Sequence, residues 1–111
     1  MASQLEVIYL KDFALSPGGR DVAGGPNSGE QFLKEVLEPA FLRHRHEEGY
    51  ILVNLDDAAP VISSFLYASF GELAVKYGVD EVEKKVHVLS TQVPMRVTMV
   101  QNQYDKVRKR S

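Results

Sequence analysis

The sequence predicts an α/β fold with a central, largely parallel sheet, and three observations support this prediction. Short apolar runs that are rich in strand-forming residues alternate with longer segments whose apolar residues recur at helical spacing. One run, residues 50–55, is apolar at almost every position, which is typical of a strand covered on both faces of a parallel sheet. The chain has 111 residues, enough for one domain and too few for two, so we expect a single domain over residues 1–111.

The beginning of the chain is predicted to contain one strand and a long loop. Residues 5–10 are apolar and rich in strand formers, and they predict the first strand. Residues 16–29 hold five glycines and two prolines, which break any regular element and predict a loop. Within this loop, residues 20–22 are a candidate short strand. Such a strand would pair antiparallel at one side and make the sheet mixed.

The first long helix is predicted to begin after Ser28 and to run to about Arg45. Ser28 is a favourable N-cap, and Gln31 three residues later completes a capping-box pattern. The apolar residues of this segment form one stripe: Phe32, Val36, Leu37, Ala40 and Phe41. Pro39 lies inside the stripe and removes one backbone hydrogen bond. The helix is therefore expected either to kink there or to end near Glu38 and restart.

The rest of the chain continues the alternation of strands and helices. Residues 50–57 predict a buried strand that leaves the core through two acids, and residues 64–77 predict a helix ended by a glycine. Residues 80–85 predict a short polar turn or helix, residues 86–89 predict a strand, and Pro94 suits the first turn of a last helix. The inward stripes of the two helices are Leu66, Phe70, Leu73, Tyr77 and Val97, Val100, Tyr104, Val107.

Composition argues against several classes of protein. An apolar fraction of 44% and a charged fraction of 25% are ordinary for a soluble globular protein, and a net charge of -2 gives no overall attraction to nucleic acid or acidic lipid. No apolar run approaches the roughly 18 residues that a membrane helix needs, and the N-terminus lacks the organisation of a signal peptide. The chain has no cysteine, and therefore no disulfide, no zinc–thiolate site and no thiol nucleophile. We expect a cytoplasmic protein without a membrane segment.

Two adjacent serines, Ser63 and Ser64, are the candidate functional group. They follow Asp56 and Asp57 in the loop that leaves the strand, at the carboxyl end of the sheet, where functional groups gather in such folds. One serine is expected to cap the following helix. A phosphorylation or partner-docking site is the functional reading, because the backbone N–H groups and the dipole tolerate a phosphate at a helix N-terminus. The two readings are compatible, since a capping serine can be modified when the helix end frays.

Phe65 is expected to lie near the surface, beside the two serines. Its face of the helix otherwise carries small or polar residues, which are Ala68, Ser69, Glu72 and Lys76. An exposed aromatic ring with polar surroundings is typical of an interface anchor. The alternative is that Phe65 packs beneath the loop against Pro60 or Val61.

The glycine-rich loop offers an alternative function, in which the chain is a small-molecule or nucleotide-binding domain. Arg20 would supply the counter-charge for an anion, and the backbone amides of Ser28 and Gly29 would donate to it. The loop matches neither the phosphate-binding loop with Gly-Lys-Ser/Thr nor the dinucleotide fingerprint. A plain connecting loop is the competing reading.

Patterns for catalysis and metal binding are weak. His44 and His46 lie two residues apart on a helix and face different directions, and the acids around Asp56 lack the further converging oxygens that magnesium needs. A serine nucleophile would need an adjacent base, and the Gly-x-Ser-x-Gly elbow is absent. The basic residues over 106–110 complement the dipole of the last helix. We therefore expect no enzyme activity, no cofactor and no metal, and an enzyme that uses the acids with magnesium is a third, minor alternative.

Two sequence blocks together resemble a known family. The first lies over residues 17–32 and reads Pro-Gly-Gly-Arg, then Gly-Pro-Asn-Ser-Gly-Glu. The second lies over residues 63–73 and begins Ser-Ser-Phe-Leu. Over residues 5–90 the chain resembles the STAS-like family of small bacterial proteins of unknown function. The resemblance implies a fold similar to that of the anti-sigma-factor antagonists of the STAS superfamily, with a central sheet and helices mainly on one face.

The resemblance also implies a function. In the antagonists, a partner ATPase of the histidine-kinase type phosphorylates a serine or threonine at the start of the second helix, and phosphorylation releases that partner. By position, Ser63 or Ser64 would be the equivalent site here. The resemblance thus implies a non-enzymatic regulatory module that binds a histidine-kinase-type ATPase or an anti-sigma-like protein. In this reading Asp56 and Asp57 set the charge at the rim of the partner surface, and Phe65 is its apolar anchor.

Overall fold

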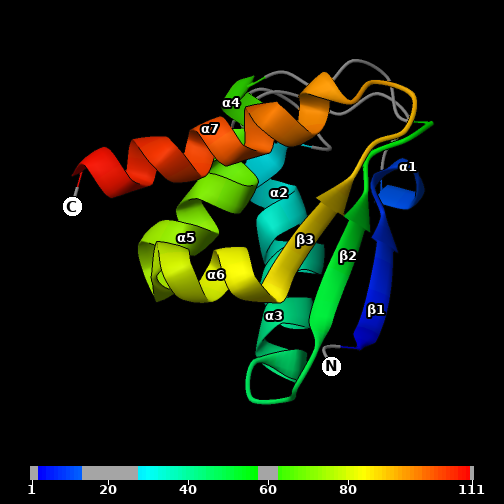
Figure 1. Ribbon diagram of the computed structural model, residues 1–111, viewed down its shortest axis with the longest axis vertical. Helices are drawn as coiled ribbons and strands as arrows, with labels where there is room; N and C mark the ends of the chain where they lie inside the picture. The colour runs from blue at the N-terminus through cyan, green and yellow to red at the C-terminus, as the bar shows by residue number, and fades with distance from the viewer. Residues whose placement is uncertain (1–2, 14–27, 58–62, 111) are drawn as a thin grey trace.

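The computed structural model describes residues 3–13, 28–57 and 63–110. Figure 1 shows the elements in chain order: β1 (Gln4–Tyr9), α1 (Leu10–Phe13), α2 (Gly29–Phe32), η2 (Leu33–Leu37), α3 (Glu38–His44), β2 (Tyr50–Asn54), α4 (Ser63–Leu66), η3 (Tyr67–Gly71), α5 (Glu72–Tyr77), α6 (Val79–Lys85), β3 (Val86–Leu89) and α7 (Met95–Arg110). The candidate strand at residues 20–22 lies outside the described residues. The other predicted strands and helices are confirmed.

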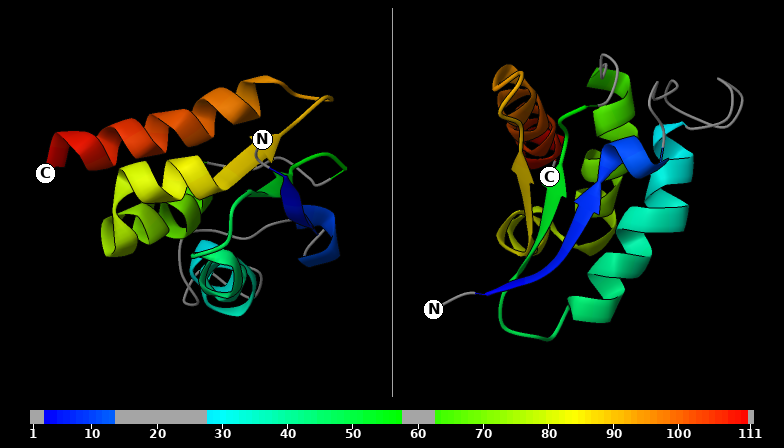
Figure 2. Two further views of the ribbon diagram at one scale, coloured as in Figure 1. Left: turned by 60° about the horizontal axis from the view of Figure 1, so that its bottom comes forward. Right: turned by 90° about the vertical axis from the view of Figure 1, so that its right-hand side faces the viewer.

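The three described strands form a parallel sheet in the order β1-β2-β3. Ile8 of β1 and Val88 of β3 are the register partners of Val53 in the central strand. Ile51 and Val53 are fully buried on the face that packs against the helices, whereas Leu52 on the opposite face is only half-buried. The expectation that residues 50–55 are covered on both faces is wrong for the described elements, because their helices lie mainly on one side of the sheet (Figures 1 and 2).

α2, η2 and α3 form one continuous helix that begins at the predicted N-cap. The Gln31 backbone N–H donates to Oγ of Ser28 at 3.1 Å, which confirms Ser28 as the cap. η2 is a π-helical turn, and at its end the Glu38 N–H bonds to the Leu33 carbonyl five residues back. Pro39 lies two residues after this wide turn, and the helix continues to His44. The expectation that the helix ends near Glu38 and restarts is therefore wrong.

α4, η3 and α5 form a second continuous helix, again with a π-helical turn in its middle. Three residues of the predicted stripe, Leu66, Phe70 and Leu73, are at 0% exposure, and the fourth, Tyr77, is half-buried. Burial extends around the helix because α2 and α7 also pack against it. Ser69 is buried on this further face, and its hydroxyl donates to the Phe65 carbonyl at 2.8 Å, so the buried polar group is satisfied within the helix.

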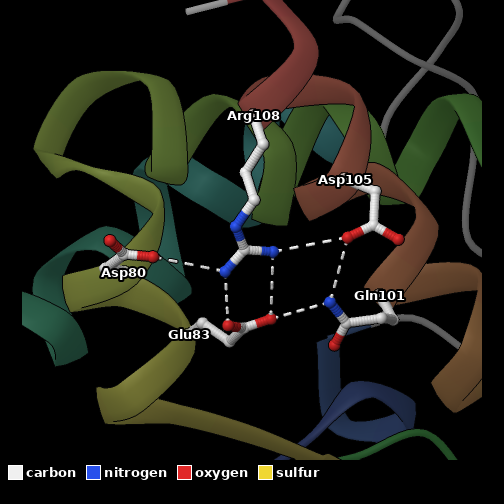
Figure 3. A network of polar contacts seen from close by, with 5 residues as sticks. All are labelled: Asp80, Glu83, Gln101, Asp105 and Arg108. Atoms are coloured by element: carbon white, nitrogen blue, oxygen red, sulfur yellow. Dashed lines mark hydrogen bonds and ion pairs between the residues drawn. The ribbon is translucent and has the colours of Figure 1, made fainter.

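A polar network joins α7 to α6 (Figure 3). Arg108 donates to the carboxylates of Glu83, Asp80 and Asp105, and its two terminal nitrogens form a fork on Glu83. Gln101 donates to Glu83 at 2.7 Å and to Asp105 at 3.3 Å. The buried side of α7 contains three predicted residues, Val100, Tyr104 and Val107. Apolar packing on one side and the network on another therefore hold this helix in place.

Candidate functional site at the carboxyl end of the sheet

Parallel strands bring their carboxyl ends to one edge of the sheet, and the candidate site lies at this edge. β1, β2 and β3 end at Tyr9, Asn54 and Leu89. α4 begins beyond the arrowheads of the strands in Figure 1. The edge therefore gathers the segment after β2, the start of α4 and the connection from β3 to α7.

Ser63 and Ser64 are the first two residues of α4, and both are exposed. The first turn of a helix has backbone N–H groups without intrahelical acceptors and carries the positive end of the helix dipole. The prediction that one serine caps the helix is not confirmed, because both serines lie within it. Two hydroxyls are thus presented at the positive end of a helix.

Phe65 is fully buried, so the expectation that it lies near the surface is wrong. Its ring packs 5.8 Å from that of Phe32 in α2, centroid to centroid. The reason for the error is that α2 and α7 pack against this face of the helix, so Ala68 and Ser69 on the same face are buried as well. The alternative contact with Pro60 or Val61 lies outside the described residues. A buried ring cannot anchor a partner, and Phe65 instead packs α4 against α2.

Asp56 joins the ends of β2 and β3. Its carboxylate accepts hydrogen bonds from the hydroxyl and backbone N–H of Thr91, from the backbone N–H of Gln92 and from the hydroxyl of Ser90. The Thr91 hydroxyl and the Gln92 N–H are the main reasons that the pKa of Asp56 falls to about 2. Asp57 follows with φ at 66°, and its backbone N–H donates to the Gln92 side chain, whose amide nitrogen donates back to Asp57. The Asp56 side chain therefore holds the loop together.

The Asp56 bonds predict a specific dependence of stability on pH. The folded-state pKa is below the usual 3.8, so the ionised carboxylate stabilises the fold above about pH 4, and this contribution is lost as the pH falls toward 2. Asp56→Asn should lower the melting temperature at pH 6, and the difference from wild type should shrink between pH 4 and pH 2. Thermal unfolding followed by circular dichroism measures this. Asp57→Asn, an adjacent change of the same charge, should have a smaller effect at pH 6, and a constant Asp56→Asn difference down to pH 2 would contradict the assignment.

The alternative anion site is not assembled in the described part of the loop. Ser28 and Gly29 are both buried, and the Ser28 hydroxyl is occupied as the cap of α2. A Cβ on Gly29 would lie 2.4 Å from the Phe65 carbonyl oxygen, so glycine is required here by the close approach of α2 and α4. Arg20 lies outside the described residues. The interpretation of Ser28 and Gly29 as anion ligands is therefore corrected to a packing role.

Comparison with known families identifies the family of this chain. The sequence model of a family described as STAS-like domains of unknown function matches residues 28–95, more than half of the chain. The chain belongs to the STAS-like family. The predicted STAS-like α/β fold is therefore confirmed, and the matched part of this STAS-like domain includes both serines. No curated protein and no solved structure matches the chain.

Exposed apolar side chains of the STAS-like domain also gather at the edge that bears the serines. Among the described residues, six large apolar side chains are exposed, and four of these lie at the carboxyl end: Tyr9, Leu89, Val93 and Met95. Met95 is the most exposed, at 69%. The sequence analysis did not identify this group. Met95 lies outside the inward stripe of α7, and this position was the signal that could have indicated its exposure. No helix in the described part of the chain is long and apolar enough to cross a bilayer.

Proposed function

We propose that this STAS-like domain is a cytoplasmic, non-enzymatic regulatory module that binds a protein partner through the carboxyl end of its sheet. The observation that carries the proposal is the exposure of Ser63 and Ser64 in the first turn of α4. The exposed side chains of Val93 and Met95, at the same end of the sheet, supply the apolar contacts that a partner surface needs and that Phe65 does not provide. The exposed Asp57 contributes a carboxylate at the rim, where it forms an ion pair with Lys11 at 3.7 Å.

The partner class comes from the resemblance to anti-sigma-factor antagonists. A histidine-kinase-type ATPase would transfer the γ-phosphoryl group of ATP to Oγ of Ser63 or Ser64, with loss of the hydroxyl proton and release of ADP. The phosphate would add about -1.5 to -2 charges, which the helix N-terminus accommodates but an apolar or acidic partner surface does not. Phosphorylation would therefore weaken the complex. The chain has Ile62 before the serine pair and Phe65 after it, so recognition would depend on the exposed surface rather than on an acid next to the serine.

Replacing Ser64 by glutamate tests the switch. In titrations of a purified histidine-kinase-type ATPase, Ser64→Glu should raise the Kd at least about tenfold, equivalent to ~1.4 kcal/mol, because it places a negative charge in the contact. Met95→Ser should also weaken binding, by removing apolar contact area. Ser3→Glu is the matched control, since Ser3 is exposed before β1 at the opposite end of the sheet. Equal Kd values for wild type, Ser63→Glu, Ser64→Glu and Met95→Ser would show that the partner surface lies elsewhere.

Mass spectrometry tests the modification separately from the binding. Incubation of the domain with the ATPase and Mg-ATP should add the mass of one phosphate, and the double variant Ser63→Ala/Ser64→Ala should remain unmodified. Phosphate on the double variant would exclude the two serines as the acceptor.

A further inference from the structure

A cavity lies at the opposite end of the sheet from the serines. It has a volume of about 840 Å³ and lies between the C-terminal ends of α3 and α6 and the first residues of β2 and β3. Figure 1 shows these four elements meeting at the bottom of the view. Cavities of about 300–1,000 Å³ are the size that proteins use for small ligands. The proposed partner surface does not use this end of the molecule.

Lys85 is a buried charge in the wall of this cavity. Its side chain is only 8% exposed, and its ammonium group donates to the Glu47 backbone carbonyl. An ammonium group has three donors, and no described carboxylate forms an ion pair with Lys85. Glu81 is close enough to Lys85 to interact electrostatically, but its direct hydrogen bonds go to Arg45. An anion in the cavity would supply a direct partner for the buried ammonium group.

Positive groups surround the one carboxylate that faces Lys85 from α6. Glu81 accepts two hydrogen bonds from Arg45, at 2.6 and 3.3 Å. These bonds are the main cause of the lowered pKa of Glu81, and the positive charges of His46 and Lys85 lower it further. Arg45 therefore neutralises Glu81.

The other acids of the cavity lining are Glu47 and Glu48. The carboxylate of Glu47 bonds to His44, outside the cavity lining, so that acid is also engaged. The lining therefore holds three cations, Arg45, Lys84 and Lys85, and three acids, Glu47, Glu48 and Glu81. Because Glu81 and Glu47 are already bonded to Arg45 and His44, the two lysines keep donors for an anion.

Two stacked rings form a flat part of the wall. The rings of Tyr50 and His87 lie 4.4 Å apart between centroids and are inclined by 11°. Nε2 of His87 lies 3.1 Å from the Lys84 carbonyl oxygen, which fixes the orientation of the ring. His87 is exposed, so a planar ligand ring can stack beside it, next to the lysines.

We propose that this cavity binds a small anion that carries a planar ring, with the size and chemistry of a nucleoside monophosphate. Lys84 and Lys85 bind the anionic group, and the aromatic pair of Tyr50 and His87 binds the ring. The ligand is a small molecule, and the site is independent of Ser63 and Ser64.

Calorimetric titration with separated parts of the ligand tests the proposal. Adenosine and guanosine monophosphate should each bind at least about tenfold more tightly than inorganic phosphate, which lacks the ring, and than the free nucleosides, which lack the anion. Backbone amide shifts in NMR spectra should change mainly over residues 45–50 and 81–87. Absence of binding by both monophosphates at millimolar concentration, or shift changes confined to another region, would overturn the proposal.

Single substitutions assign the contacts. Lys84→Ala and His87→Ala change exposed side chains, so folding should be retained, and each should weaken monophosphate binding by about tenfold or more. Lys109→Ala removes the same charge from the exposed face of α7, and Ser64→Glu adds a charge at the other end of the sheet, so both should bind like wild type. Equal affinities for Lys84→Ala, His87→Ala and Lys109→Ala would rule out the site.

Discussion

Replacing Phe65 by alanine should lower the free energy of unfolding by about 3–5 kcal/mol, the usual cost of removing a buried phenylalanine ring. The side chain is fully buried, and its ring packs on Phe32, whose ring in turn lies 6.4 Å from that of Phe70. The substitution would leave a cavity between α2 and α4 that the neighbouring rings fill only partly. Urea unfolding followed by circular dichroism gives the value.

Two further variants make the Phe65 result specific. Phe65→Leu keeps most of the apolar volume and should lose much less stability than Phe65→Ala. Met95→Ala changes a side chain that is 69% exposed and should stay within about 0.5 kcal/mol of wild type. A loss below about 1 kcal/mol for Phe65→Ala would instead indicate an exposed ring, and would return Phe65 to the list of candidate partner contacts.

Replacing Gly29 by valine should be the second most damaging change, with an expected loss of about 3 kcal/mol or more. A Cβ at this position would lie 2.4 Å from the Phe65 carbonyl oxygen and 3.0 Å from the Ala68 Cβ. The first of these neighbours is backbone, so α2 or α4 must move as a whole to relieve the clash. Gly29→Ala should already destabilise the protein in the same direction, although alanine is the better helix former.

The control for Gly29 lies in the same helix. Glu35 is exposed, and Glu35→Ala should change the free energy of unfolding by no more than about 0.5 kcal/mol. Thermal and urea unfolding of the three variants measure the series. Equal stability of Gly29→Ala and wild type would mean that α2 and α4 are not in close contact at this point.

Local signals predicted most of the fold. These signals depend only on residues that are close in the sequence. They are the cap at Ser28, the apolar stripes and the strand formers at residues 5–10 and 86–89, and the structure confirms the elements that they predict. Uniform apolarity over residues 50–55 was less informative. It identified a strand correctly but could not show that the described helices cover one face only, because the sequence of a strand does not contain the position of its neighbours.

The candidate site was predicted less completely, for two physical reasons. The exposure of Ser63 and Ser64 agrees with their place at the start of a helix. Phe65 was misplaced because α2 and α7 cover its face of the helix, and the sequence of one helix does not contain the position of its neighbours. The role of Asp56 depends on residues 90–92, which become neighbours only when β2 and β3 pair in the sheet. The cavity at the other end likewise combines residues 45–50 with residues 81–87, two segments that are separate in the sequence.

The close packing of α4 on α2 has a consequence for how phosphorylation of the two serines would act. Below the serines, the ring of Phe65 and the close backbone approach at Gly29 hold the start of this helix against the core, so a phosphate added above it would leave the backbone where it is. Phosphorylation would then change the electrostatic potential of a rigid surface and would not rearrange the domain. A partner would lose little entropy in meeting such a preorganised surface.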